Sequence, residues 1–271
     1  MRKEIPLAVV FSLGRLIGEQ GDKTRQAPAY TTTSIVNAAT GANGELGPNT
    51  LITIHGAGLA YTTRALRTDD IRDGVLPTQL SGTGVRVLLS GIPIHILYVS
   101  PTQINCLVPS NLRPVDVNLT ATLDGLSGPA VRLRLNRVAP GLFTMPDRSA
   151  IALRPGGQLA SLEARAQGGE MVVLFATGLG DTLPPSRPGA IANQRATLAA
   201  MADFRVLLNG QAVPPGNIQY AGATPGFAGV FQINVALPDW IGTDPEIRIE
   251  MGENASPPGI LLHASPVTSS R

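Results

Sequence analysis

The residues best suited to acid–base chemistry near neutral pH are the three histidines, His55, His95 and His263. None of them has another histidine, a cysteine or a carboxylate at the spacing of a metal-ligand motif. The sequence also lacks the Gly-x-Ser-x-Gly element of α/β hydrolases, the P-loop and the Gly-x-Gly-x-x-Gly fingerprint. A structural role is therefore predicted for each histidine, while a catalytic triad assembled from distant segments stays open.

An acidic cluster at Asp69, Asp70 and Asp73 is the segment that most resembles a calcium loop. With Asp69 as the first ligand, Ile71 stands at the third position and Leu80 at the twelfth, where an EF-hand loop requires oxygen ligands. The cluster is therefore predicted to lie in a solvated loop between strands, with a calcium site of another kind as the alternative.

Aromatic residues, which often stack on sugar rings in carbohydrate-binding sandwiches, make up only 4% of the chain. Trp240 is the single tryptophan, and it is expected to cover the open end of a sandwich, with a stacking platform as the alternative. Asn118 and Asn254 begin glycosylation sequons, a short pattern that is frequent by chance. No catalytic, cofactor-binding or metal-binding residue is predicted, and no cofactor.

The composition limits both the fold and the partners. A formal net charge of only +2 gives no concentrated basic face, which argues against nucleic-acid binding. The single cysteine, Cys106, excludes an internal disulfide and a multi-cysteine zinc site. Because 30 glycines and 23 prolines break the apolar residues into short alternating runs, the predicted class is all-β.

Three blocks of sequence recur in the same order in the two halves of the chain and indicate a tandem repeat. LITIHGAGLA at residues 51–60 matches MVVLFATGLG at 171–180, and VRVLLSG at 85–91 matches FRVLLNG at 204–210. QINCLVP at 103–109 matches QINVALP at 232–238. The third block is shifted by about ten residues in the second half, which predicts an inserted loop near residues 223–228.

Each block reads as a strand followed by turn residues, of which Asn-Gly at 209–210 is the strongest hairpin signal.

Ile104, Cys106 and Val108 alternate on one face, so Cys106 is predicted to be a buried, inert thiol. Further strands are expected at 115–123, 131–135 and 246–251, and a hairpin at 150–161. Arg132 and Arg134 should lie on the wet face of their strand.

About seven short strands per copy predict two tandem immunoglobulin-like β-sandwiches, residues 30–137 and 138–271. The segment at 137–140 contains proline and ends an alternating run, so a hinge is expected there. Residues 1–29 read as a signal-like or disordered segment. They carry an apolar run at 5–13 and an Ala-x-Ala site at 27–29, separated by an unusually long charged spacer.

Four segments together resemble a known family: SPTQINCLVP at 100–109, VAPGLFT at 138–144, LFATGLGDT at 174–182 and GVFQINVALP at 229–238. They are similar to the uncharacterised C-terminal domain family named after Solibacter proteins. Both halves are also similar to IPT/TIG-type Ig-like domains, and the resemblance covers residues 34–267. It implies an exported protein and assigns no catalytic residues.

The function predicted first is a non-enzymatic structural or adhesive binding module, secreted or at the cell surface, without a transmembrane span. Its partner would be an unknown protein or polysaccharide, bound through loops such as 223–228 with Tyr220 and Trp240 nearby. The alternatives are a carbohydrate-binding accessory module, which needs Trp240 or Tyr220 exposed, and a hydrolase with a dispersed site beside one of the histidines.

Overall fold

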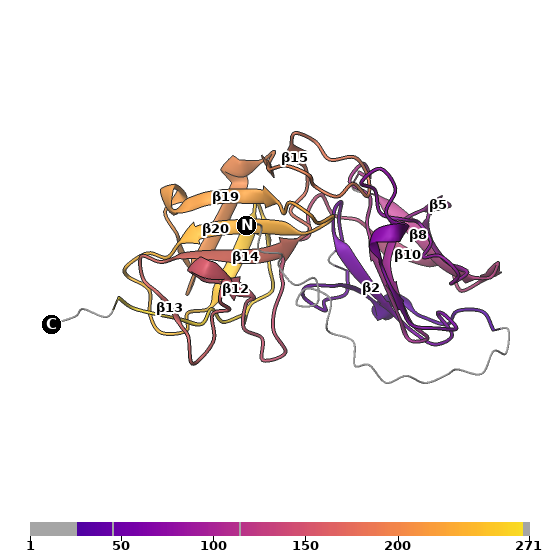
Figure 1. The fold of residues 1–271 in the computed structure, drawn as a ribbon, viewed down its shortest axis with the longest axis horizontal. Helices are drawn as coiled ribbons and strands as arrows, with labels where there is room; N and C mark the ends of the chain where they lie inside the picture. Colours follow the sequence, from indigo (N-terminus) through magenta and orange to yellow (C-terminus); the bar gives the residue numbers. More distant parts are fainter. Residues whose placement is uncertain (1–25, 45, 114, 268–271) are drawn as a thin grey trace.

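The computed structural model describes residues 26–44, 46–113 and 115–267, and within them the chain folds as two tandem β-sandwiches. Figure 1 shows the sandwiches side by side along the long axis of the molecule, with β2, β8 and β10 in one and β14, β19 and β20 in the other. The apolar run and spacer of the predicted signal segment lie outside the described residues. Ala29, in the predicted cleavage site, exchanges two backbone hydrogen bonds with Ala57.

The first sandwich packs a five-stranded sheet on a second sheet with an added hairpin strand. The first sheet has the order β1 (Ile35–Asn37), β2 (Leu51–His55), β7 (Gln103–Leu107), β6 (His95–Val99), β3 (Arg64–Ala65). The second has the order β10 (Val131–Arg134), β8 (Asp116–Leu123), β4 (Val85–Leu89), β5 (Ile92–Pro93), with β9 (Leu126–Ser127) paired to β8.

The second sandwich repeats this plan. One sheet has the order β11 (Gly141–Leu142), β14 (Met171–Thr177), β20 (Phe231–Ala236), β19 (Ile218–Ala223), β16 (Ala196–Leu198), β15 (Thr182–Leu183), and β12 (Ala152–Leu153) pairs with β14. The other has the order β18 (Gln211–Ala212), β17 (Phe204–Leu208), β21 (Ile247–Met251), β22 (Asn254–Ala255). A parallel pair, β13 (Ala166–Gln167) and β23 (Ala264–Ser265), lies beside them.

Within the residues that the structure describes, the helical content is confined to single 3₁₀ turns, as the many glycines and prolines predict. These turns are η1 (Thr32–Ser34), η2 (Thr68–Asp70), η3 (Pro155–Gly157), η4 (Met201–Asp203) and η5 (Pro215–Asn217). No helix in the part of the chain that the structure describes is long and apolar enough to cross a membrane.

The repeated blocks occupy equivalent strands with the same register. Ile54 on β2 faces Ile104 on β7, and Leu174 on β14 faces Ile233 on β20. The strand next to each third block carries a bulge at the same place, before Tyr98 in β6 and before Tyr220 in β19. The tandem repeat read from the sequence is therefore present in the backbone pairing itself.

The second block of each copy ends in a tight turn with both central residues at positive φ. Ser90 and Gly91 have φ of 49° and 84°, and Asn209 and Gly210 have φ of 49° and 77°. Two successive positive φ values define the turn whose twist matches a two-residue β-hairpin. The predicted hairpins β4–β5 and β17–β18 are thus formed by the turn chemistry of the sequence.

Each sandwich has its own apolar core, built from the faces that the alternating pattern assigns to the interior. Ile104, Cys106 and Val108 are all buried in the first core, as predicted. Burial raises the pKa of the Cys106 thiol well above its usual range, because the charged thiolate loses its hydration. Cys106 is therefore held as an unreactive thiol.

A third apolar cluster joins the two sandwiches. Leu51 and Leu107 from the first sheet of the first sandwich pack there with Phe175, Ala228 and Val230 of the second. All five are buried, with at most 6% of any of them exposed. The sandwiches therefore share a continuous apolar interface, which resists independent motion of the two halves.

The connection between the sandwiches is packed and does not form the hinge that the sequence analysis expected. Val138 and Ala139 are buried, and the Ala139 amide donates a 2.8 Å hydrogen bond to the carbonyl of Gly178. The proline and glycine that suggested flexibility, Pro140 and Gly141, are also buried. Tertiary contacts on both sides of this segment override the turn propensity of its residues.

Candidate functional site

Polar groups also cross the junction between the sandwiches. The Asn49 side-chain amide donates a 3.0 Å hydrogen bond to the carbonyl of Gly180, and the Leu51 amide donates a 2.9 Å bond to the hydroxyl oxygen of Thr177. That hydroxyl lies 2.8 Å from the carbonyl of Gly229. Because buried hydrogen bonds require aligned partners, these contacts specify one relative orientation of the two sandwiches.

A segment after β15, residues 184–192 and here called the strap, lies across the first sandwich (Figure 1). The Leu76 amide donates to the carbonyl of Gly189 at 2.9 Å, and the Ile191 amide donates to the carbonyl of Gly74 at 2.8 Å. Gly189 has a φ of 69° and rests against the imidazole of His95, where a side-chain Cβ would overlap the ring. The strap thus docks through backbone groups at a position that requires glycine.

His95 is the buried histidine of this junction, with 9% of its surface exposed. Its Nδ1 atom has no hydrogen-bond partner among the described residues. Burial lowers the pKa of His95 from its ordinary value, because the imidazolium would lose its hydration. His95 therefore acts as a neutral packing residue beneath the strap.

We expect the free energy of unfolding to fall as the pH drops below about 6.5, the pKa of an unperturbed histidine. The pKa of His95 is lower in the folded state than in the unfolded chain, so below about pH 6.5 the unfolded chain binds more protons at this residue. The stability that is present above about pH 6.5 is therefore lost as the pH falls to the folded-state pKa. Urea unfolding at about pH 7 and pH 5 measures this loss, in a range above the carboxylate pKa values. His95→Gln should reduce this loss of unfolding free energy, whereas the control His55→Gln, at an exposed site, should show the same loss as the parent. If the parent and both variants lost the same free energy, His95 would not be the source of the pH dependence.

The strap and the first sandwich border a groove of about 280 Å³, here called the junction groove. Asp73 comes from the first sandwich, and Pro184, Arg187, Asn193 and Gln194 come from the second. A small void of about 20 Å³ adjoins the groove, shares Arg187 with it, and is lined by Phe227 and Leu107. A ligand in this groove would contact both sandwiches at once.

A second groove, of about 340 Å³, lies between the connection and one end of the second sandwich. Its charged lining comprises Arg137, Asp181, Asp203 and Glu253. Across residues 26–44, 46–113 and 115–267, no group of three or more His, Cys, Asp or Glu side chains lies close enough to hold a metal ion. This groove is therefore an acidic hollow without a defined coordination site.

The insertion at residues 223–228 is a loop, as predicted, but it does not project as a free recognition loop. Ala228 is buried in the junction cluster, and the Gly226 amide and Phe227 carbonyl bond to the backbone of Ala192 in the strap. Tyr220 is also buried, with its hydroxyl donating to the carbonyl of Ala223 at 2.7 Å. The expectation that Tyr220 could be a sugar platform is therefore wrong, because the residue is only 5% exposed and the Arg195 guanidinium lies over its ring, 4.4 Å from the ring centroid.

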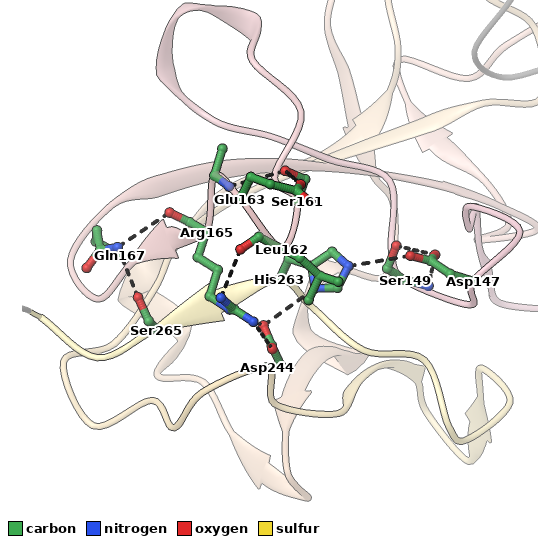
Figure 2. Close-up of polar contacts among 11 residues, drawn as sticks. Asp147, Ser149, Ser161, Leu162, Glu163, Arg165, Gln167, Asp244, His263 and Ser265 are labelled. Atoms are coloured by element: carbon green, nitrogen blue, oxygen red, sulfur yellow. Dashed lines mark hydrogen bonds and ion pairs between the residues drawn. The ribbon is translucent and has the colours of Figure 1, made fainter.

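His263 lies in a polar cluster on the second sandwich, where it is flanked by two carboxylates (Figure 2). Its Nε2 is 3.6 Å from an oxygen of Asp147, and its Nδ1 is 3.4 Å from an oxygen of Asp244. Arg165 binds Asp244 through two hydrogen bonds of 2.7 and 2.9 Å, which lower the pKa of that carboxyl. The Ser149 hydroxyl donates to Asp147 at 2.6 Å and lowers its pKa in the same way.

The arrangement around His263 ties loops together and does not reproduce a nucleophilic triad. Ser149 is buried and its hydroxyl donates a hydrogen bond to the carboxylate of Asp147, whereas a serine nucleophile must be exposed and hydrogen-bonded to the histidine. Neither groove described above includes any residue of the cluster. Of this cluster, only His263 was considered in the sequence analysis. Its partners lie up to 116 positions away from it in the sequence and belong to no recognisable motif.

The structure also places the other residues that the sequence analysis considered. His55 is exposed, and Trp240 has 43% of its surface exposed, so Trp240 still offers a flat ring to solvent. Asp70 forms a two-bond ion pair with Arg64 at 2.8 and 2.9 Å, which gives the acidic cluster a structural role. The remaining predicted surface residues, Arg132, Arg134, Asn118 and Asn254, are exposed.

Residues 34–133 match the sequence profile of the IPT/TIG domain. The first sandwich is thus similar to an IPT/TIG domain. No curated protein matches the chain. The second sandwich shares the strand register and the bulge of the first. Membership of the Solibacter-type family stays a prediction.

The solved structures that match this chain are distant from it. The plexin A4 extracellular region is 12% identical with a TM-score of 0.28, over 88% of this chain and 16% of plexin. The γ-CGTase of alkalophilic Bacillus clarkii is also 12% identical, with a TM-score of 0.28, over 92% of this chain and 27% of the enzyme. SGBP-B of a Bacteroides ovatus mixed-linkage glucan utilization locus was solved in complex with a mixed-linkage heptasaccharide. It is 13% identical with a TM-score of 0.31, over 82% of this chain and 42% of SGBP-B. These likenesses carry no inference about function.

Proposed function

We propose that this chain is a non-enzymatic binding module, secreted or at the cell surface, in which two sandwiches, residues 30–137 and 138–271, act as one rigid unit. The observation that carries the proposal is the junction. A shared apolar cluster fixes the orientation of the sandwiches, and the junction groove beside it is lined by residues of both. A rigid composite surface binds with a small entropic cost, because few groups must be ordered when the ligand arrives.

A carbohydrate-binding accessory module is the second candidate, and the exposure of Trp240 favours it. An indole ring that is 43% exposed can stack on the apolar face of a sugar. Trp240 does not line the junction groove, so the two candidate surfaces can be separated by mutation. A hydrolase with a dispersed site is the third, and the His263 cluster is where it would lie.

The proposal is tested by measuring adsorption of the full chain to intact bacterial cells, cellulose, chitin and starch, and to immobilised extracellular proteins. We expect binding to at least one of these surfaces, weakened about tenfold or more by Arg187→Ala and unchanged by Trp240→Ala. Binding that is lost only with Trp240→Ala would favour the second candidate. Absence of binding to every surface, or turnover of nitrophenyl esters or glycosides that disappears with His263→Ala, would contradict the proposal.

A further inference from the structure

The polar side chains of the junction groove are arranged for a ligand outside the protein. Asp73, Arg187, Asn193 and Gln194 are all exposed and line the groove. Among the described residues none of the four side chains makes a hydrogen bond or an ion pair with another residue, in contrast to the paired Arg64, Arg154 and Arg165 elsewhere. The hydrogen-bonding capacity of the groove is therefore available to whatever enters it.

These four side chains together present both donors and acceptors without a net charge. Arg187 offers guanidinium donors, Asp73 offers carboxylate acceptors, and the amides of Asn193 and Gln194 offer both. The planar groups can each contact two adjacent hydroxyls of a ligand. One cation and one anion give the groove no net positive charge, which does not favour the phosphate backbone of a nucleic acid.

The walls of the groove are unsuited to a peptide strand. β15 is the edge strand on this side, and it is followed by Pro184 and Pro185. Because proline lacks a backbone N–H, the edge cannot continue a ladder of hydrogen bonds to an added strand. No aromatic residue lines the groove itself, so the apolar anchor pocket typical of protein–protein hot spots is also missing from it.

Apolar side chains also line the groove beside its polar rim. Pro184, Pro185 and Ile191 are part of its lining, whereas the adjoining void of about 20 Å³ next to Phe227 has room for little more than a water molecule. A ligand that fits the groove needs a hydroxyl-rich edge and an apolar face. A sugar ring has both, since its hydroxyls point outward and its C–H groups form a face that packs on apolar side chains.

From this geometry we infer that the junction groove binds a neutral saccharide through Asp73, Arg187, Asn193 and Gln194. The inference rests on the proposed binding function and adds the chemical class of the ligand. The backbone bonds between the strap and residues Gly74 and Leu76 place Arg187 and Asp73 in the lining of the same groove.

The test is isothermal titration of the full chain with neutral gluco-, manno-, galacto- and xylo-oligosaccharides, with an oligogalacturonate as the acidic comparison. We expect at least one neutral oligosaccharide to bind with a Kd at or below about 1 mM. The double variant Asn193→Ala/Gln194→Ala should weaken that binding about tenfold or more, because both exposed amides lose their ligand contacts without a loss of packing. Gln211→Ala, an exposed amide on β18, is the matched control and should bind like the parent.

Each other outcome overturns the inference in a distinguishable way. If no neutral oligosaccharide binds, the saccharide assignment fails, while adsorption to a protein surface that is lost with Arg187→Ala would leave the proposed binding function standing. If a saccharide binds equally to the parent and the double variant, with equal thermal stabilities, the groove is not its site. Preference for the oligogalacturonate would mean that an anion, and not a neutral sugar, is recognised.

Discussion

Replacing Phe175 with alanine is expected to lower the free energy of unfolding by about 3–5 kcal/mol, the usual cost of deleting a fully buried phenylalanine ring. Phe175 is only 2% exposed and packs in the cluster shared by both sandwiches. The ring therefore supports both the second sandwich and its contact with the first. Urea unfolding followed by circular dichroism should show a lower midpoint, together with separation of the single parental transition into two.

The repeat provides a matched control for this substitution. His55 occupies the position in β2 that Phe175 occupies in β14, because His55 faces Gln103 and Phe175 faces the equivalent Gln232. His55 is exposed, so His55→Ala should change the unfolding free energy by no more than about 0.5 kcal/mol. Equal effects of the two substitutions would show that the junction cluster contributes little to stability.

Replacing Gly178 with alanine is expected to cost about 2–5 kcal/mol, from backbone strain and from displacement of neighbouring atoms. Gly178 has a φ of 74°, and a Cβ there would overlap the carbonyl of Ala139 in the connection and lie 2.9 Å from the hydroxyl of Thr50. Both neighbours are held by the junction, so neither can move without breaking hydrogen bonds. Differential scanning calorimetry should show a lowered Tm.

Gly210→Ala separates the two contributions. Gly210 has a φ of 77°, but no atom lies within 4 Å of a Cβ built there, so this substitution carries the φ strain alone. We expect a loss of about 1–2 kcal/mol for it, clearly smaller than that of Gly178→Ala. A loss as large as that of Gly178→Ala would mean that the connection yields easily and that the junction is softer than proposed.

Local alternation and turn residues were enough to predict the strands, their buried faces and the hairpin turn at Asn209-Gly210 from the sequence. Ile104, Cys106 and Val108 lie on the core face as their period-two spacing predicts, and Asn209-Gly210 forms the hairpin turn that the dipeptide favours. Because the three blocks recur in both halves, the same strands and core faces could be predicted for each copy. Comparing the sequence with itself therefore predicts equivalent strands when two copies must bury the same faces.

How the two copies meet, and which polar groups come together, could be seen only in the folded structure. The segment at 137–140 contains residues typical of a hinge, yet residues 138–140 are buried and the Ala139 amide bonds to the carbonyl of Gly178. The junction groove and the His263 cluster each combine residues that are far apart in the sequence. Turn propensity and periodicity describe a residue's near neighbours, whereas burial and charge pairing depend on segments that only folding brings into contact.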